Sequence, residues 1–259
     1  MFLPGINIEI MKEPLGFRYG KGVYGPNPEQ RTLDSIRRSL RNPDCEGPEV
    51  VYSIAMDVAE ERHRQELEER MLLFGIVTYA PGKLGDEPIR SQGHIHSIST
   101  HSGWSPPEMY EIWQGKAVIY MQETAKDQPG RCFAVYAEPG DVVVVPPNWA
   151  HATISANPEE ALTFGAWCDR DYGFEYDEVR AHQGLAWYPL VKEDNSLTWM
   201  HNDRYNYSAL IIKKPADYSD SLGIEHGEPI YKQFEREPGR FQWVSKPQLK
   251  QKIWTNFTP

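Results

Sequence analysis

The chain has 259 residues, of which 40% are hydrophobic and 12% aromatic, so it can fill a substantial core and is neither a disordered nor a fibrous protein. Its formal net charge of -10 argues against binding to nucleic acid or to an anionic membrane, because both need a basic surface. No segment approaches the roughly 20 apolar residues of a membrane span, and the first residues do not resemble a signal peptide. Three cysteines without a CxxC pair favour a reducing compartment, and we expect a cytoplasmic protein.

The first part of the chain, residues 1–48, is predicted to be an extension that contains one helix. Leu33, Ile36 and Leu40 recur at spacings of three and four among charged residues, which predicts a surface helix over residues 29–41. Strands are expected next, over residues 49–55 and 71–80. The charged segment between them, 57–70, is compatible with a short helix or with an exposed hairpin.

Short strands then recur between Gly, Pro, Asn and acidic turn residues. They are expected over residues 109–114, 117–122, 131–137, 141–145, 151–155 and 162–167. This spacing predicts an antiparallel sandwich or barrel that occupies residues 49–180.

The last part, residues 181–259, contains strand candidates at 185–191 and 197–200, followed by a tail rich in proline and charge. It is expected to pack on the barrel, to extend a sheet or to contact a second subunit.

A predicted metal site dominates the chemistry of the chain. In His94-Ile95-His96 the alternation of a strand points both imidazoles to one face. Glu108 begins a predicted strand that ends at Gly115, and His151 follows a Pro-Pro turn. Three imidazoles and one carboxylate suit Fe, Mn, Ni or Zn, so we expect one divalent ion per chain.

The carboxylate ligand is expected to be Glu108. On a strand, Glu108 and Tyr110 point the same way, whereas Glu111 points to the opposite face. The segment between the second histidine and Glu108, residues 97–107, contains His101 and is expected to be a loop. Either this loop bulges over the mouth of the pocket, or Glu111 and not Glu108 is the metal ligand. His101 is a weaker candidate for a substrate contact.

These residues resemble the two motifs of the cupin barrel, a double-stranded β-helix or jelly roll. The first motif is matched by His94, His96, Glu108 and Gly115, and the second by Gly140, Pro146 and His151. Together with the stretch Pro81-Gly82-Lys83, the chain is more specifically similar to the cupin-type glucose-6-phosphate isomerases. The resemblance spans roughly residues 50–176.

This resemblance implies an all-β cupin barrel with a short helical N-terminal extension and a C-terminal appendage. It implies metal-dependent interconversion of glucose 6-phosphate and fructose 6-phosphate, with a sugar phosphate as the small-molecule partner. Because exposed sheet edges often pair in such barrels, a homodimer is expected.

The resemblance also implies roles for individual residues. The metal ligands are His94, His96, Glu108 and His151, and the expected catalytic residues are Glu108, His151 and Tyr110. The expected substrate contacts are Tyr52, Thr78, Ser91, the Gly93 backbone and Tyr176. Two residues differ from the family pattern, since Trp167 stands where a tyrosine is expected and Phe174 where a histidine is common.

Several alternatives stay open at this point. Glu108 could move a proton between C1 and C2 through an enediol, or it could shuffle a hydroxyl proton during a hydride shift. The substrate could be another sugar or sugar phosphate. The residues are also compatible with a cupin-type mononuclear iron dioxygenase and with a non-catalytic sugar-binding cupin.

Overall fold

The computed structural model describes residues 2–259 and consists mainly of β-sheet, as the strand spacing predicted. One sheet has six strands in the order β14-β11-β16-β7-β5-β4, and a second has four in the order β15-β12-β13-β20. The six-stranded sheet contains β4 (Glu29–Thr32), β5 (Val50–Met56), β7 (Leu72–Tyr79), β11 (Glu108–Gln114), β14 (Val142–Val145) and β16 (Leu162–Asp169). The four-stranded sheet contains β12 (Ala117–Gln122), β13 (Cys132–Ala137), β15 (Ala150–Ser155) and β20 (Leu210–Lys213). Neighbours are antiparallel except β13 and β20, which are parallel.

Smaller elements connect and cover these sheets. The two-stranded pairs are β1 (Ile8–Lys12) with β2 (Leu15–Tyr19), β3 (Val23–Tyr24) with β6 (Ala59–Glu60), β8 (Lys83–Leu84) with β9 (Glu87–Pro88), β10 (Ile95–His96) with β17 (Phe174–Glu175), and β18 (Trp187–Val191) with β19 (Leu197–His201). The helices are α1 (Leu33–Ile36), η1 (Arg37–Ser39), η2 (Glu61–His63), α2 (Arg64–Glu69), α3 (Asp177–Ala181), α4 (Ser219–Leu222), α5 (Ile230–Arg236), α6 (Gln242–Ser245), η3 (Pro247–Lys250) and α7 (Gln251–Trp254).

The central strands of the six-stranded sheet, β7, β11 and β16, are buried on both faces. Its inner-facing side chains, such as Val77 and Ile112, share one apolar core with Ile119 and Phe133 of the four-stranded sheet. Its outer-facing side chains pack in a second core, against the C-terminal part of the chain. Because successive residues of a strand point to opposite faces, β7, β11 and β16 divide their side chains between these two cores.

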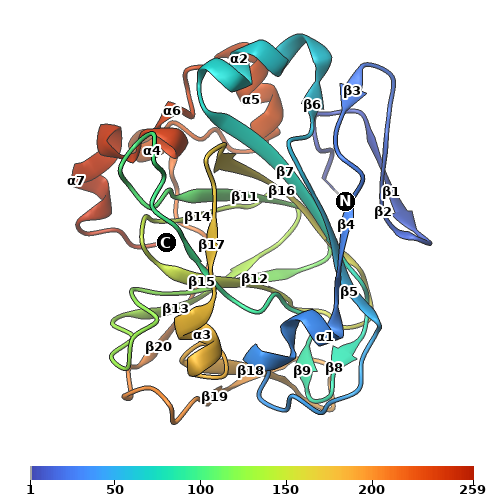
Figure 1. Cartoon of the computed structure of the whole chain (residues 1–259), viewed down its shortest axis with the longest axis vertical. Helices are drawn as coiled ribbons and strands as arrows, with labels where there is room; N and C mark the ends of the chain where they lie inside the picture. The colour runs from blue at the N-terminus through green and yellow to red at the C-terminus, as the bar shows by residue number, and fades with distance from the viewer. Residues whose placement is uncertain (1) are drawn as a thin grey trace.

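The C-terminal part covers the outer face of this sheet. The ring of Trp167 on β16 stacks on Tyr231 of α5 with a centroid distance of 5.8 Å, and Phe234 lies 4.8 Å from the same indole. In Figure 1 the red helices of this part gather beside α2, whereas β18, β19 and β20 lie at the opposite end of the molecule. This segment therefore packs on the large sheet through its helices and extends the small sheet through β20.

The helix predicted over residues 29–41 is wrong at its start. Residues Glu29–Thr32 form the edge strand β4, which pairs with β5, and only then does α1 begin. The Thr32 hydroxyl accepts a hydrogen bond from the Ser35 amide at 3.4 Å and caps that helix. The apolar spacing from Leu33 onward was therefore helical, but sheet pairing decided the conformation of the four residues before it.

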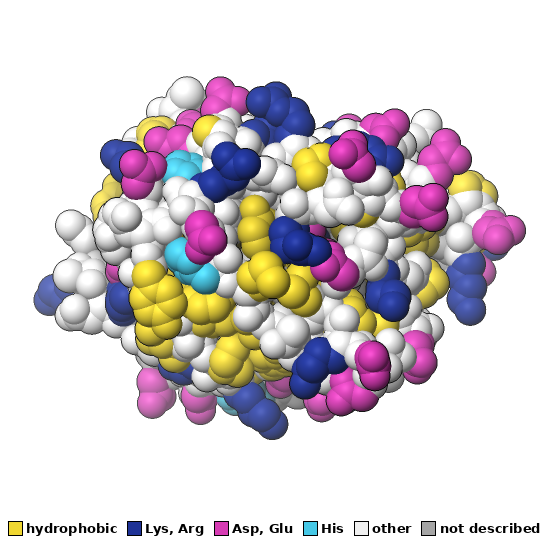
Figure 2. Space-filling model, turned by 90° about the horizontal axis from the view of Figure 1, so that it is seen from below, with side chains coloured by type: hydrophobic (Ala, Val, Ile, Leu, Met, Phe, Trp, Pro, Cys, Tyr) yellow, Lys and Arg dark blue, Asp and Glu magenta, His cyan; other side chains and the backbone are white. Residues whose placement is uncertain are grey.

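The undecided segment 57–70 contains η2 and α2 and is not a hairpin. Figure 2 shows basic and acidic side chains interspersed on one face of the molecule, so this face has no basic patch of the kind that nucleic acid requires. Within residues 2–259, none of the helices has the length and hydropathy needed to cross a bilayer.

Candidate metal centre and active site

Backbone pairing brings His94 and His151 together. The His94 amide donates to the His151 carbonyl at 3.0 Å, and the His151 amide donates to the His94 carbonyl at 2.9 Å. This isolated antiparallel bridge joins the segment before β10 to β15, and it places the two imidazole centroids 4.3 Å apart. His96 follows on β10, and its ring lies 5.0 Å from that of His151.

Glu108, the first residue of β11, points to the same place from the large sheet. Its Oε2 lies 3.3 Å from Nε2 of both His96 and His151. One ligand atom from each of these three residues and from His94 lies within 4.8 Å of the others. The structure thus brings the four predicted ligands together, while Glu111 faces the outer core.

The donor set fits a divalent ion. The ring nitrogens Nδ1 of His96 and His151 donate to the carbonyls of Pro106 and Trp149, at 2.8 and 3.0 Å, which leaves Nε2 of each as the nitrogen that faces Glu108. The Nε2 atoms of His94 and His96 are buried without a hydrogen-bond partner among the described residues. Buried, unpaired nitrogens beside a carboxylate are the arrangement that metal ligation would satisfy.

The electrostatics of the cluster keep Glu108 ionised. Burial alone raises the pKa of a carboxyl group, but the hydrogen bond with His151 and the His96 imidazole 3.3 Å away more than offset it and hold the pKa of Glu108 well below its usual range. Burial, helped by the neighbouring imidazoles, lowers the pKa of His94 well below its usual value, so this ring is neutral. A neutral imidazole and an ionised carboxylate are the forms that bind a metal.

Two further side chains contact Glu108. The Tyr110 hydroxyl donates to Oε2 at 2.5 Å, and the Cys168 thiol donates to Oε1 at 3.1 Å. Burial and the nearby carboxylate raise the pKa of both donors well above their usual values, so each keeps its proton. Donors on β11 and β16 therefore fix the orientation of both carboxylate oxygens of Glu108.

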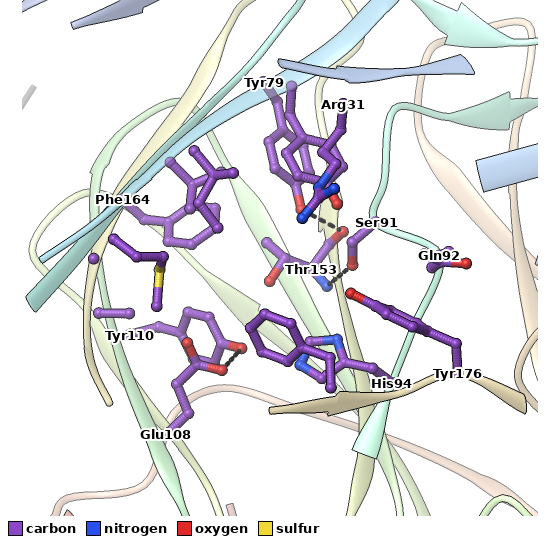
Figure 3. Close-up of a pocket in the computed structure, with 17 residues that line it drawn as sticks. Arg31, Tyr79, Ser91, Gln92, His94, Glu108, Tyr110, Thr153, Phe164 and Tyr176 are labelled. Carbon is purple, nitrogen blue, oxygen red and sulfur yellow. Dashed lines mark hydrogen bonds between the residues drawn. The ribbon is translucent and has the colours of Figure 1, made fainter. Parts of the chain in front are cut away.

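A cavity of about 620 Å³ opens in front of this cluster, between the inner faces of the sheets. Figure 3 shows Glu108, Tyr110 and His94 on one side of it, with Arg31 and Tyr79 on the other and Ser91 and Thr153 between them. Its apolar wall is formed by Ile54, Met56, Val77, Phe164, Ala166 and Phe174. Polar groups stand at both ends of this cavity, with apolar side chains between them, as in many small-molecule sites.

The predicted substrate contacts fall into three groups. Tyr52, Ser91 and Tyr176 line the cavity. Gly93 does not line it; it has a φ of +87° at the turn before His94, and a Cβ there would lie 3.0 Å from Leu185 Cδ1. Its predicted substrate contact through the backbone stays a prediction.

Thr78, another predicted substrate contact, does not line the cavity, and its contact stays a prediction. Thr78 lies on β7 between Val77 and Tyr79, which both face the cavity, so its own side chain faces the outer side of the sheet. There its hydroxyl lies 2.9 Å from the Thr163 hydroxyl. The inward position next to Thr78 is occupied by the apolar Val77.

The two residues that differ from the family pattern have different surroundings. Trp167 points outward into the second core, where its Nε1 donates to the Ile230 carbonyl at 3.4 Å, and it does not reach the cavity. Cys168 is the inward residue at this level of β16. Phe174 does line the cavity, and its ring lies 4.5 Å from that of His94.

The loop over residues 97–107 does not line the cavity either. The Asp171 carboxylate accepts hydrogen bonds from the Thr100 amide and hydroxyl at 2.6 and 2.7 Å. Nε2 of His101 donates to the Ser245 carbonyl at 2.8 Å, so this ring contacts the C-terminal segment and not the cavity. The loop contacts the site through the Pro106 carbonyl that orients His96, and its Ser105 hydroxyl accepts a hydrogen bond from the Asn148 amide in the turn before His151.

Sequence reasoning missed Arg31 and the contact of Cys168 with Glu108. Arg31 lay within the helix predicted over residues 29–41, and the helical pattern did not indicate that its side chain faces the barrel. The signal for Cys168 was its alternation with Ala166 along β16, which pairs with β11, the strand of Glu108 and Tyr110.

Comparisons with known proteins agree with this geometry. The family model described as "Glucose-6-phosphate isomerase (GPI)" matches residues 37–208. The glucose-6-phosphate isomerase of Thermococcus litoralis is 31% identical over 150 residues, which are 58% of this chain and 69% of that protein. That of Pyrococcus abyssi is 30% identical over 195 residues, covering 72% of this chain and 93% of that protein.

Solved structures align less well. The S161A mutant of Bacillus subtilis oxalate decarboxylase covers 51% of this chain and 29% of its own, with 16% identity and a TM-score of 0.33. A likeness this low adds nothing to the strand order given above.

Proposed function

Because the chain belongs to the glucose-6-phosphate isomerase (GPI) family, we propose that it interconverts glucose 6-phosphate and fructose 6-phosphate in the cavity in front of Glu108. The observation that carries this proposal is the convergence of His94, His96, Glu108 and His151 at one end of a cavity of about 620 Å³. An aldose and ketose differ by the position of one hydrogen and one carbonyl, so the reaction needs a base and a way to stabilise charge on two adjacent oxygens. The site supplies residues for both tasks.

We also propose that the two facing sheets form a cupin barrel. Their inner faces share one core, and the four candidate ligands come from β10, β11, β15 and the segment before β10. A homodimer and a cytoplasmic location, both expected from the sequence, stay predictions.

The proposed metal ligands are His94, His96, Glu108 and His151. A divalent ion of Fe, Mn, Ni or Zn held there would supply positive charge beside the two substrate oxygens on which negative charge develops. Phe174 packs against the His94 ring and excludes water from that side of the cluster.

Glu108 is the proposed base. Its carboxylate is ionised, and it lies at the end of the cavity where C1 and C2 of the sugar would be held. In an enediol route it takes the proton from C2 and returns it to C1, and in a hydride-shift route it moves a hydroxyl proton. In both routes Tyr110 and Cys168 fix the orientation of the carboxylate by donating to its two oxygens.

The other end of the cavity is proposed to hold the rest of the substrate. Tyr52 and Tyr176 present hydroxyl groups, and the Ser91 hydroxyl accepts from the Thr153 amide at 3.1 Å, which orients it across the cavity. The Gly93 amide stays a predicted contact beside these three. Hydroxyl and amide donors can hold a phosphate without a large basic surface.

A coupled assay of fructose 6-phosphate conversion tests the proposal. The protein is measured as purified, after chelation, and after addition of each of the four metals. We expect chelation to abolish activity and at least one metal to restore it. His96→Ala should lower the bound metal per chain, measured by mass spectrometry, whereas His226→Ala at an exposed histidine should not.

Full activity after complete metal removal would contradict the metal assignment. Turnover of other sugars but not of fructose 6-phosphate would contradict the substrate assignment. Oxygen consumption, followed with an electrode during the same assay, would indicate a dioxygenase instead.

A further inference from the structure

Arg31 reaches the cavity because β4 is a strand. Its register pairs Arg31 with Tyr52 and Glu29 with Ile54 on β5, and both of these partners line the cavity. Side chains of directly opposed residues share one face of a sheet, so Glu29 and Arg31 project to the cavity side of β4. The pairing register shifts directly after Arg31, between it and Thr32.

The charge of the cavity is concentrated at two points. Figure 3 draws 17 lining residues, and among these, all from the described part of the chain, Arg31 alone has a side chain that is always cationic. Glu108 is the carboxylate among them, and Figure 3 shows it on the opposite side of the cavity from Arg31. A molecule with an anionic end and an isomerisable end would therefore have only one favourable orientation.

Arg31 also stands at the mouth of the cavity. A neighbouring surface depression of about 630 Å³ shares Arg31, Ile54, Met56 and Phe174 with the cavity. Glu29 lines this depression but not the cavity. The Arg31 side chain is 32% exposed and its Nη1 lies 2.7 Å from Oε1 of Glu29, which is 62% exposed. An ion pair this exposed to water is weak, so another anion can replace the Glu29 carboxylate at Arg31.

One of the hydroxyl groups predicted to contact the phosphate is missing from the cavity, and Arg31 offers another donor there. Val77 occupies the inward position of β7, and Thr78 faces away from the cavity. Two hydroxyl groups of the cavity interact with the Arg31 charge: Tyr52, which was predicted to contact the phosphate, and Tyr176, which was predicted to contact the sugar. Burial raises the pKa of each tyrosine, and the Arg31 charge acts in the opposite direction. Arg180, whose guanidinium lies 4.7 Å over the Tyr176 ring and whose Nε donates to Gln92, does not line the cavity.

We propose that Arg31 holds the dianionic phosphate monoester of the substrate, in exchange for its pairing with Glu29, and thereby makes the enzyme select phosphorylated over free sugars. This inference rests on the proposed function and deepens it, because it names the residue that recognises the substrate class. A guanidinium presents a rigid planar fork of donors that matches two phosphate oxygens, whereas a lysine ammonium acts as a point charge without this fixed geometry. Glu29 then acts in the opposite sense, since its carboxylate competes with the phosphate for Arg31.

The proposal predicts opposite effects for two neighbouring substitutions. Binding of sorbitol 6-phosphate, which has no carbonyl group to isomerise, is measured by calorimetry on the metal-loaded protein, with sorbitol as the unphosphorylated reference. Arg31→Gln should raise the Kd of sorbitol 6-phosphate about 10- to 100-fold. Arg31→Lys should give an intermediate loss, and Glu29→Gln should lower the Kd about 2- to 5-fold. None of the three should change sorbitol binding by more than about twofold.

A matched control pair exists on the neighbouring hairpin. Arg18 on β2 pairs with Glu9 on β1 at 2.8 Å, across strands and at the surface, and neither residue lines the cavity. Arg18→Gln and Glu9→Gln should leave both ligands unaffected. The melting temperature of every variant is measured beside binding, so that a loss of fold is recognised.

The outcomes separate this inference from the proposed function. An unchanged Kd for sorbitol 6-phosphate in Arg31→Gln overturns the inference, and so does an equal loss of sorbitol and sorbitol 6-phosphate binding. Failure of the native protein to bind sorbitol 6-phosphate also overturns it. If the native protein binds sorbitol 6-phosphate through Arg31 but does not convert fructose 6-phosphate, the isomerase function fails while the phosphate site stands.

Discussion

Glu108 and Glu111 lie on the same strand, β11, and both are buried, yet their surroundings give them opposite properties. Glu108 faces inward, where imidazoles hold its pKa well below the usual range. Glu111 faces outward, where burial raises its pKa to about 8, only partly offset by hydrogen bonds from Trp113 Nε1 and the Ile230 amide. The Glu108 carboxylate lies beside imidazole nitrogens, and the Glu111 carboxylate binds the Ile230 amide and so links the C-terminal segment to the sheet.

This contrast separates the chemical face of the sheet from its structural face. The inner face meets a cavity and the candidate metal ligands, whereas the outer face meets the aromatic rings of α5 and α6. The same residue type is therefore a candidate base on one face and a buried structural acceptor on the other. Three predictions test how complete this separation is.

The largest expected effect is on catalysis by the two carboxylates. Glu108→Gln should lower kcat about 10²- to 10⁴-fold, because it removes the proposed base. Glu111→Gln should leave kcat within about threefold of the native enzyme, because that side chain does not reach the cavity. Steady-state kinetics with fructose 6-phosphate measures both. A loss of comparable size in the two variants would break the contrast.

Glu111 should instead govern stability as a function of pH. Its folded pKa of about 8 lies above the ordinary value of 4.5, so between these values the unfolded chain releases a proton that the folded chain keeps. The free energy of unfolding should therefore fall as pH rises from about 4.5 to 8, by on the order of 3–5 kcal/mol from this group, and then level off.

Urea denaturation at several pH values checks this expectation. Glu111→Gln should remove most of that pH dependence, at a cost of about 1 kcal/mol at pH 5 for one weakened hydrogen bond. Glu138→Gln, at an exposed residue paired with Lys116, serves as the control and should keep the native profile. An identical slope in Glu111→Gln and the native protein would assign the pH dependence to other groups.

The smallest expected effect concerns Cys168. Cys168→Ala removes the donor to Glu108 Oε1 and should lower kcat about 3- to 10-fold with little change in KM, whereas Cys168→Ser, which keeps a donor, should retain most of the activity. Cys132→Ala removes another buried thiol, one that donates to the Gly130 carbonyl outside the cavity, and should not alter kcat. If the alanine and serine variants lose activity equally, the thiol does not act by hydrogen bonding.

The metal cluster could be predicted in advance because its signal is local. His94 and His96 are two residues apart in an extended segment, and Glu108 and His151 are the first and second residues of their strands. The face of Thr78 could not be predicted in this way: its side chain lies on the outer side of β7, and in a strand a shift of one residue moves a side chain to the opposite face. Arg31 was missed because the helical spacing of Leu33, Ile36 and Leu40 was extended backward over residues that instead pair with β5.

The sequence by itself predicted the strand-rich fold, the four candidate metal ligands and the preference for Glu108 over Glu111, because strand alternation and the spacing of motif residues can be recognised locally. Only the tertiary structure decided that β4 brings Arg31 to the cavity, that Cys168 contacts Glu108 and that the C-terminal helices cover the outer face. These features join residues far apart in the chain, such as Glu111 and Ile230. Contacts of this kind arise from the packing of one face against another, which no local period in the sequence encodes.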